Sequence, residues 1–417
     1  MMKLHIFIFK YLFFYIVVMF MATSTFAATI KTDRTWYLAG EVMEVCVTDD
    51  KALIAYAELC DTHGLAAGVV VGLKGGTGKG GIELPSNLHS GYYMLSAYTC
   101  HSADVSQRLI AVVNPLRKSA DDDIKWVLDD SCWVDTSSTL REYGAVNKVQ
   151  TSNFKVQTPE TEGHIIKARV KNVYDGNTFR DSQICPSLSI VGKQIHYFEG
   201  KMVDDSTAVF YTFGIQGRLP LVLSALSSTG INLPIEMISP FATLLPKELP
   251  HLVFHYKRSE VEARSLDMQR HKIAEEEKEI VPLDYDETVV GTKPDLSYNL
   301  DEYRQFLTIK EVLLEYVSCV KTTKNDGMSQ LIVRREQEVY NSSLPTLVLI
   351  DGMPVVDIER LLNYDARRIH YINIYGSQYT FGNGIYNGIL SFVTRSGRLT
   401  NYPIERNMQY LVYDFPR

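Results

Sequence analysis

Short segments that alternate apolar with polar residues, or run apolar without a break, recur along the first part of the chain. Clusters of turn-forming residues separate them, including Leu38-Ala39-Gly40 and Asp61-Thr62-His63-Gly64. Short strands at such spacing are typical of an antiparallel β-sandwich, so the pattern predicts a first β-domain over residues 28–115. Its expected strands are 42–47, 52–59, 68–73, 92–99 and 108–113.

The same pattern returns further along and predicts a second β-domain over residues 161–257. Residues 116–160 read as a polar connector with one or two short elements. Residues 258–300 are highly charged, with Glu-Glu-Glu-Lys-Glu at 275–279, and are expected to form a helical or extended linker. The strands expected in the second domain are 165–173, 188–191, 208–213, 221–226 and 252–256.

The last part of the chain mixes the two periodicities. Between residues 301 and 320, apolar residues recur at steps of three and four, which predicts one amphipathic helix with Tyr303, Phe306 and Tyr316 among its apolar positions. A second, short helix is expected at 358–364, so residues 301–417 are predicted to form an α/β module. Its expected strands are 330–334, 346–350, 369–375 and 388–394.

The N-terminus has the features of a secretory signal peptide. Lys3 and Lys10 precede an apolar run over residues 12–22, and small residues lead up to Ala27, after which cleavage is expected. The alternative is an uncleaved membrane anchor, although the run is short for a hydrocarbon layer of about 30 Å. We therefore expect an exported protein with peripheral membrane association at most, in the periplasm or at the outer membrane of a Gram-negative bacterium.

Composition excludes some classes of protein. Of 417 residues, 42 are Lys or Arg and 49 are Asp or Glu, so the net charge of −7 disfavours a nucleic-acid binder, which needs surplus basic charge. The six cysteines show no Cys-x-x-Cys spacing, which argues against structural zinc. They are also too few for a disulfide scaffold, and most are expected to be buried thiols, although pairings cannot be deduced from spacing.

A glycine-rich stretch at residues 72–81 invites comparison with a phosphate-binding loop. Counted back from Gly78-Lys79, Leu73 occupies the position of the required first glycine, and Gly80 replaces the magnesium-binding Ser or Thr. Pro85 follows where the loop needs a helix. We therefore expect a flexible hairpin connection and no nucleotide or other cofactor.

Two other patterns suggest metal ions without supplying a suitable site. His251 and His255 are four residues apart, but the surrounding sequence predicts a strand, on which they would lie roughly 13 Å apart. The acidic runs 121–123 and 129–130 lack the spaced oxygen ligands of a calcium loop. The sequence thus predicts neither metal nor catalytic residues.

Part of the first β-domain resembles the macroglobulin-type sandwich of large bacterial envelope proteins. The matching motifs are Tyr37-Leu38-Ala39-Gly40-Glu41, for a pattern Y-x-x-G-E, and residues 91–99, for a pattern G-x-Y-x-L-x-A-Y-T. The Cys-Gly-Glu-Gln thioester of true macroglobulins is absent, so the resemblance does not imply protease trapping. The central β-domain, opening at residues 162–165, resembles Ig-like modules.

The last module resembles the plug domain of TonB-dependent outer-membrane receptors. The matching segments are residues 345–355, with Asp351-Gly352 in a pattern L-x-x-I-D-G-x-P, then 369–375 and 387–394. Asp351-Gly352 is expected to form a tight turn after a buried strand. The residues after Thr394 are too few for a receptor barrel. The predicted fold class is therefore mainly β and multidomain, with two Ig- or macroglobulin-like β-sandwiches followed by a small α/β plug-like domain.

These resemblances imply a non-enzymatic interaction or accessory protein of the cell envelope, associated with outer-membrane TonB-dependent uptake systems. Its expected partners are envelope or outer-membrane proteins. The alternatives are a secreted hydrolase acting on glycan or peptide, and a structural or adhesive surface protein. Tyr371, Tyr375 and Tyr379 are candidate partner-facing residues, since aromatic side chains are enriched at interface cores; the alternative is a half-buried strand with ordinary tyrosines.

Overall fold

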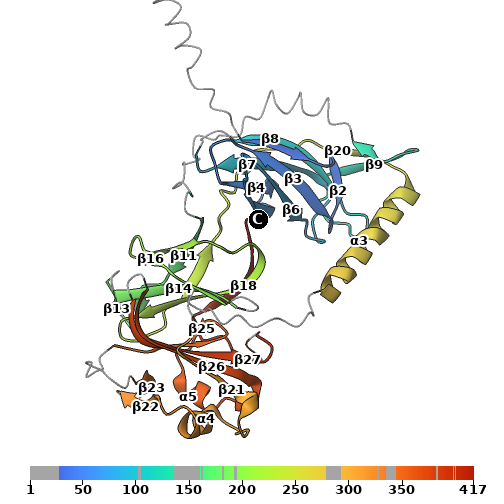
Figure 1. Cartoon of the computed structure of the whole chain (residues 1–417). Helices are drawn as coiled ribbons and strands as arrows, with labels where there is room; N and C mark the ends of the chain where they lie inside the picture. Colours follow the sequence, from blue (N-terminus) through green and yellow to red (C-terminus); the bar gives the residue numbers. More distant parts are fainter. Residues whose placement is uncertain are drawn as a thin grey trace, which may run out of the picture. The chain divides into compact units, whose positions relative to one another are not determined.

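The computed structural model describes the chain from residue 28 onward and forms two compact units (Figure 1). The first unit comprises residues 1–161 and 241–269, and the second comprises 162–240 and 270–417. The fold is mainly β, as predicted. The predicted signal peptide lies outside the described residues, which are 28–101, 105–134, 160, 163–180, 183–191, 195–278, 293–325, 328–334, 344–381, 384–397, 399 and 401–417.

The first unit contains the predicted sandwich. Its core lies between the two sheets and includes Tyr37, Met43, Leu59, Ile82 and Tyr93, all fully buried. The smaller sheet has the order β1 (Thr29–Thr32), β3 (Val42–Thr48) and β6 (Thr77–Glu83). The larger sheet has the order β2 (Trp36–Leu38), β8 (Ser106–Val113), β7 (Gly91–Thr99), β4 (Ile54–Cys60) and β5 (Leu65–Gly72).

The glycine-rich stretch connects these two sheets. Gly75 and Gly76 have φ of 61° and 78°, which favours glycine, and they form a tight turn. A Cβ on Gly78 would lie 2.2 Å from the carbonyl oxygen of Gly72, and one on Gly80 would lie 2.9 Å from Val71 Cγ2. The glycines thus allow close packing of the chain, and the predicted flexible hairpin is corrected to a turn between strands of different sheets.

A third layer covers the outer face of the larger sheet. Every residue of β4 and β7 is buried, which requires cover on both faces because strand side chains alternate in direction. Part of the cover is a small sheet in which β20 (Leu252–Tyr256) lies between β9 (Ile124–Leu128) and β10 (Trp133–Val134). Phe254 of β20 is fully buried and contacts Trp36 of the larger sheet, with ring centroids 5.0 Å apart.

The domain boundary differs here from the predicted one. The strand at 252–256 is confirmed, but it pairs with β9 and β10 of the first unit rather than with the second β-domain. Residues 241–269 therefore belong to the first unit. The predicted linker begins with a helix, α3 (Arg258–Lys278), whose Val261 joins the core under the third layer.

Helix α3 is held to the first unit by the Y-x-x-G-E motif. The Arg264 guanidinium donates to both carboxylate oxygens of Glu41, at 2.6 and 2.7 Å. Its Cζ also lies 3.9 Å from the centroid of the Trp36 ring, within the range of a cation–π interaction. Glu41 thereby ties the start of the sandwich to a helix more than 200 residues later in the chain.

We expect Arg264→Ala to lower the free energy of unfolding of the first unit by about 1.5–3 kcal/mol. The substitution removes both short hydrogen bonds to the Glu41 carboxylate and leaves it with the longer contact from Arg34, at 3.6 Å. Urea unfolding followed by tryptophan fluorescence measures this directly, since all three tryptophans lie in the first unit. Arg258→Ala on the same helix is the control: its pair with Glu262 is exposed, and the expected change is under about 0.5 kcal/mol. Equal effects of the two variants would contradict this account.

The second unit begins with the second predicted sandwich. Its core includes the fully buried residues Leu188, Phe210, Leu221 and Leu233. One sheet has the order β16 (Lys201–Met202), β17 (Thr207–Thr212), β11 (His164–Val170) and β19 (Ile235–Ile238). The other has the order β15 (His196–Glu199), β14 (Ile184–Ile190), β18 (Gly217–Ser227) and β28 (Gln409–Phe415), and β12 (Val173–Tyr174) pairs separately with β13 (Asn177–Thr178).

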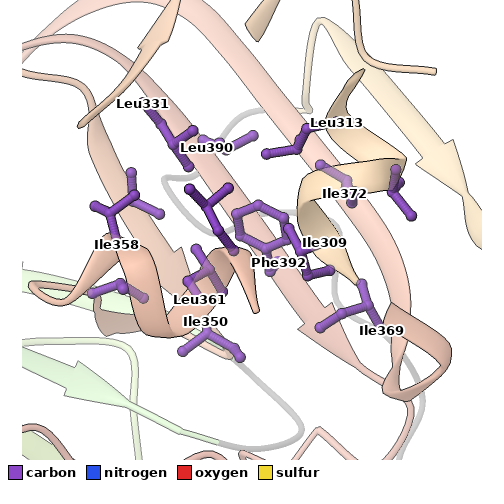
Figure 2. Close-up of a cluster of buried hydrophobic side chains, with 14 of the residues drawn as sticks. Ile309, Leu313, Leu331, Ile350, Ile358, Leu361, Ile369, Ile372, Leu390 and Phe392 are labelled. Carbon is purple, nitrogen blue, oxygen red and sulfur yellow. The ribbon is translucent and has the colours of Figure 1, made fainter. Parts of the chain in front are cut away.

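The rest of this unit is an α/β module whose bounds differ from the predicted 301–417: β21 (Leu296–Asn299) lies in the predicted linker, and β28 belongs to the second sandwich. Its five-stranded sheet has the order β21 (Leu296–Asn299), β26 (Ile369–Phe381), β27 (Gly384–Thr394), β24 (Leu347–Ile350) and β25 (Met353–Pro354). Apolar side chains from one face of the sheet pack with those of α4 (Ile309–Glu315), α5 (Ile358–Leu362) and the hairpin β22 (Val320–Asn325)–β23 (Met328–Val333), as Figure 2 shows. Phe392 of β27 is fully buried in this core.

The helix predicted over residues 301–320 is much shorter than expected. A 3-10 turn, η3 (Leu300–Glu302), precedes a loop, and α4 begins only at Ile309. Thr308 is its N-cap, and Glu311 completes a capping box, which fixes the start of the helix. Tyr303 and Phe306, predicted as helical core positions, therefore lie in the loop before α4.

The predicted tight turn at Asp351-Gly352 is confirmed. Both residues have positive φ, 46° and 88°, and they join β24 to β25 as a two-residue hairpin. Asp351 is fully buried, and its carboxylate accepts hydrogen bonds from the backbone N–H groups of Thr394 and Leu399, each at 2.7 Å. Burial raises the pKa of Asp351, while these bonds act in the opposite direction.

Candidate functional site

The three candidate tyrosines lie on β26, on the face opposite the helices. Tyr375 is fully buried in a cluster that includes Leu349 of β24 and Ile195, just before β15 of the second sandwich. Tyr371 and Tyr379 are half-buried against the same cluster. For Tyr375 the predicted exposure is wrong, because both faces of this sheet are covered within the second unit. The role of Tyr371 and Tyr379 at an interface remains a prediction.

The two histidines lie as the strand prediction requires, with His255 in β20 and His251 just before it. His251 pairs with Asp123. His255 Nδ1 lies 3.1 Å from Asp129 Oδ2, and its ring stacks on Trp133 at 3.8 Å. Among the described residues, no group of three or more His, Cys, Asp or Glu side chains is arranged to hold a metal ion.

Glu58 is a fully buried acid whose hydrogen-bond partners give it a structural role. Its carboxylate accepts hydrogen bonds from the backbone N–H groups of Thr243 (3.0 Å) and Leu244 (2.6 Å) and from the Tyr98 hydroxyl (3.0 Å). Burial raises the pKa of Glu58. Glu58 therefore attaches the segment that contains Thr243 and Leu244 to the outer face of the larger sheet. A second buried acid there, Glu160, accepts a hydrogen bond from the Tyr56 hydroxyl at 2.7 Å.

The six cysteines form no disulfide bonds with one another, and the expectation that most are buried is wrong: Cys60 and Cys100 are buried, and the other four are partly exposed. Burial raises the pKa of Cys60 to about 12 and that of Cys185 to about 11, so neither thiol is activated as a nucleophile. No helix in the described part of the chain is both long and apolar enough to cross a membrane.

A surface depression in the α/β module combines arginines with aromatic rings, and we call it the arginine depression. It is formed by three segments that are far apart in sequence: the stretch from η3 through α4, the turn η4 (Ala366–Arg368), and the residue after β27. Its lining consists of Leu300, Tyr303, Arg304, Gln305, Phe306, Val312, Tyr316, Ala366, Arg367 and Arg395.

Several hydrogen bonds fix the loop that forms one wall of the depression. The Tyr316 hydroxyl donates to the carbonyl oxygen of Arg304 at 3.2 Å. The Ala366 N–H donates to Leu307 at 3.1 Å, and the Ile309 N–H donates to Tyr364 at 3.1 Å. The wall is thus held on both sides by α4 and by the turn η4, so the depression is formed before any ligand arrives.

Two of the three arginines are held by carboxylates at the rim. Arg367 makes a bidentate pair with Asp365 at 2.9 Å for both contacts, and this pair lowers the pKa of Asp365. Arg395 lies 2.6 Å from Asp301, and this contact lowers the pKa of Asp301. Arg304 is exposed, and its side chain has no hydrogen-bond or ion-pair partner within the described part of the chain.

Sequence reasoning missed the arginine depression for two reasons. The spacing of apolar residues places Tyr303, Phe306 and Tyr316 on the apolar face of a long helix, which gives no indication that their rings line a surface depression. Arg304, Arg367 and Arg395 are isolated in sequence and form no basic run. A local signal did exist in Thr308 and Glu311, because the capping-box pattern marks the true helix start and leaves the preceding aromatics in a loop.

No protein-family model matches the chain, and no curated protein does. Among solved structures, a biofilm-associated protein BSP domain is 10% identical, with a TM-score of 0.19, and the match covers 56% of this chain and 30% of that one. An Escherichia coli alpha-2-macroglobulin activated by porcine elastase is 13% identical, with a TM-score of 0.20, and the match covers 50% of this chain and 19% of that one.

A tetra-tandem repeat from the extending region of a large adhesion protein is 11% identical, with a TM-score of 0.18, covering 51% of this chain and 49% of that one. This chain thus spans less than two thirds of each of these three solved chains.

Proposed function

We propose that this chain is an exported, non-enzymatic interaction protein that binds a protein partner through its α/β module. The observation that carries the proposal is the arginine depression. Its aromatic rings and guanidinium groups are types of side chain enriched at protein interfaces, and Arg304 is exposed there. The fixed loop limits the entropy lost on binding.

The plug-like sequence pattern supports a more specific version of the proposal. In that version the partner is an envelope or outer-membrane protein associated with TonB-dependent uptake, in a Gram-negative bacterium. The signal-peptide pattern at residues 1–27 is consistent with this location. An adhesive or structural surface role is the other possibility, and the experiment below distinguishes the two by the partners that are captured.

We expect Arg304→Glu to remove a specific partner from a crosslinked pull-down on envelope fractions, because it reverses the charge of the exposed arginine. Arg406→Glu is the matched control, since Arg406 is also an exposed arginine of the second unit but does not line the depression. Circular dichroism should show that both variants remain folded.

The identity of the captured protein then tests the specific version. Recovery of an outer-membrane uptake component would support the plug-based proposal, whereas recovery of surface-layer or matrix components would favour adhesion. Retention of every partner by Arg304→Glu would contradict docking at the depression. Turnover of a glycan or peptide substrate by the purified protein would contradict the non-enzymatic proposal.

A further inference from the structure

We infer that two copies of this chain pair through the open edge of β28 and form a dimer with two-fold symmetry. The second sandwich carries this inference, which goes beyond the proposed function and does not involve the arginine depression. It depends on three features of β28: the edge lacks the usual protection against pairing, its backbone presents hydrogen-bonding groups outward, and its sequence is complementary to itself in antiparallel register.

Strand β28 is a long edge strand without the features that normally prevent strand addition. Natural edge strands are usually short, or contain Lys, Pro or a bulge. Among the edge strands of the four- and five-stranded sheets in the described ranges, only β5 and β28 exceed four residues. β5 contains Gly68 and Gly72, which weaken a strand. β28 has seven residues with no Lys, Pro or Gly and pairs with β18 without a bulge, so it can serve as a template for another strand.

The backbone groups of Tyr410 and Val412 point away from the sandwich. Val412 lies opposite Pro220 of β18, which has no N–H, and the Pro220 carbonyl oxygen accepts from the Val191 N–H at 3.0 Å. This position of β18 therefore bonds towards β14, and the Pro220–Val412 pair exchanges no hydrogen bonds. Because antiparallel pairs alternate between bonded and non-bonded, Val412 and, two residues earlier, Tyr410 present their N–H and C=O groups at the open edge. No strand in the described part of the chain pairs with β28 on that side.

Two copies of β28 complement each other when they run antiparallel about Val412. The Tyr410 and Val412 side chains are 48% and 49% exposed on one face of the strand, and Asp414 is exposed on the same face. Pairing about Val412 places the two valines opposite each other, and places Tyr410 of each copy opposite Asp414 of the other. Asp414 is the single charged residue of β28, so this register keeps like charges from facing each other. Pro416, which has no N–H, ends the pairing after Asp414.

The self-complementary register favours a second copy over the strand of another protein as the occupant of this edge. It gives apolar contact at the centre of the pair and leaves no carboxylate opposite another. The contact is nevertheless small, with one strand from each copy, whereas stable interfaces bury roughly 1,200–2,000 Å². We therefore expect a weak, reversible dimer that forms as the protein concentration rises.

The test is sedimentation velocity of the full chain over a wide range of protein concentrations. We expect the wild-type protein to shift from monomer to dimer, and Val412→Lys to raise the dimer Kd about tenfold or more, because it places two ammonium groups opposite each other. Val173→Lys is the matched control at a valine of the same unit that is 46% exposed, and it should leave the Kd unchanged. Val412→Pro removes an N–H that β18 does not use, so circular dichroism should show a folded protein while the dimer is lost.

Introduced cysteines test the register of the pair. In an antiparallel pair, opposite Cα atoms lie about 4.5–5.5 Å apart, which is within the range of a disulfide. Val412→Cys should therefore crosslink to itself under mild oxidation, and Tyr410→Cys should crosslink to Asp414→Cys only when the two variants are mixed. Mass spectrometry identifies the linked peptides, since the chain has six cysteines of its own. Crosslinking of Val412→Cys no greater than that of Val173→Cys would overturn the inference.

The association measurements can also contradict the inference. It would be overturned by a wild-type protein that stays monomeric at every concentration, or by a dimer that persists in both Val412→Lys and Val412→Pro. Loss of an envelope partner from a Val412→Lys pull-down, with a monomeric wild-type protein, would show instead that the edge accepts the strand of another protein. None of these results depends on Arg304→Glu, so this inference and the proposed function can fail separately.

Discussion

Leu349→Asp is expected to unfold the α/β module while leaving the first unit folded. Leu349 is fully buried in β24, between β25 and β27 of the five-stranded sheet. Its side chain belongs to the cluster that covers the face opposite the helices. An unpaired carboxylate at this position would lose its hydration without gaining a partner, at a cost of several kcal/mol, which is a large fraction of the stability of a typical domain.

The effect can be measured by limited proteolysis combined with tryptophan fluorescence. We expect rapid cleavage within residues 300–417, with unchanged tryptophan emission, because the three tryptophans report on the first unit. Leu314→Asp provides the matched control: it makes the same substitution in the same module at a side chain that is 79% exposed on α4. Unchanged protease resistance of Leu349→Asp would mean that the assignment of this core is wrong.

Phe415→Ala is expected to lower the stability of the second sandwich by about 3–5 kcal/mol, the usual range for removing a buried phenylalanine. Phe415 is 1% exposed in β28, the C-terminal strand, which pairs with β18. Tyr413 on the same strand is also buried, and its hydroxyl lies 2.6 Å from His164 Nε2 of β11. The substitution therefore creates a cavity in the sandwich core, although the residue belongs to the region predicted as the plug-like domain.

Val412→Ala on the same strand is the control for Phe415→Ala. Val412 is 49% exposed, so its truncation should change the free energy of unfolding by less than about 0.5 kcal/mol. Hydrogen exchange localises the effect: amides of β11, β14 and β18 should lose protection in Phe415→Ala. If protection were lost in the α/β module alone, the assignment of β28 to the sandwich would be refuted.

The substitutions in the arginine depression and the two core substitutions test different kinds of prediction. The core substitutions depend on burial, which the apolar strand predicted at 346–350 already indicated for Leu349 but which no predicted strand indicated for Phe415. The depression depends on residues brought together by the fold. Binding residues on an exposed loop are hard to recognise in the sequence, because binding requires that they lie close together in space and not that they follow a periodic pattern.

The sequence alone was sufficient to predict most strands, the short helix α5, and the turn at Asp351-Gly352. Each of these depends on neighbouring residues: alternation fixes a strand, and a two-residue turn with positive φ fixes a hairpin. It also indicated that β4 would be a strand, because the segment is apolar and bounded by turns. Such features involve few residues close in the chain, so local chemistry determines them.

The tertiary structure decided which strands share a sheet and which side chains reach the surface. β20 pairs with β9 across more than 120 residues of sequence, and β28 pairs with β18 across nearly 200. The sequence does not identify these partners, because strands pair through backbone hydrogen bonds that any sequence can make. Tyr375 is buried because a second layer covers its face of the sheet. Arg304, Arg367 and Arg395 meet only because a capping box ends the loop at Thr308 and η4 packs beside it.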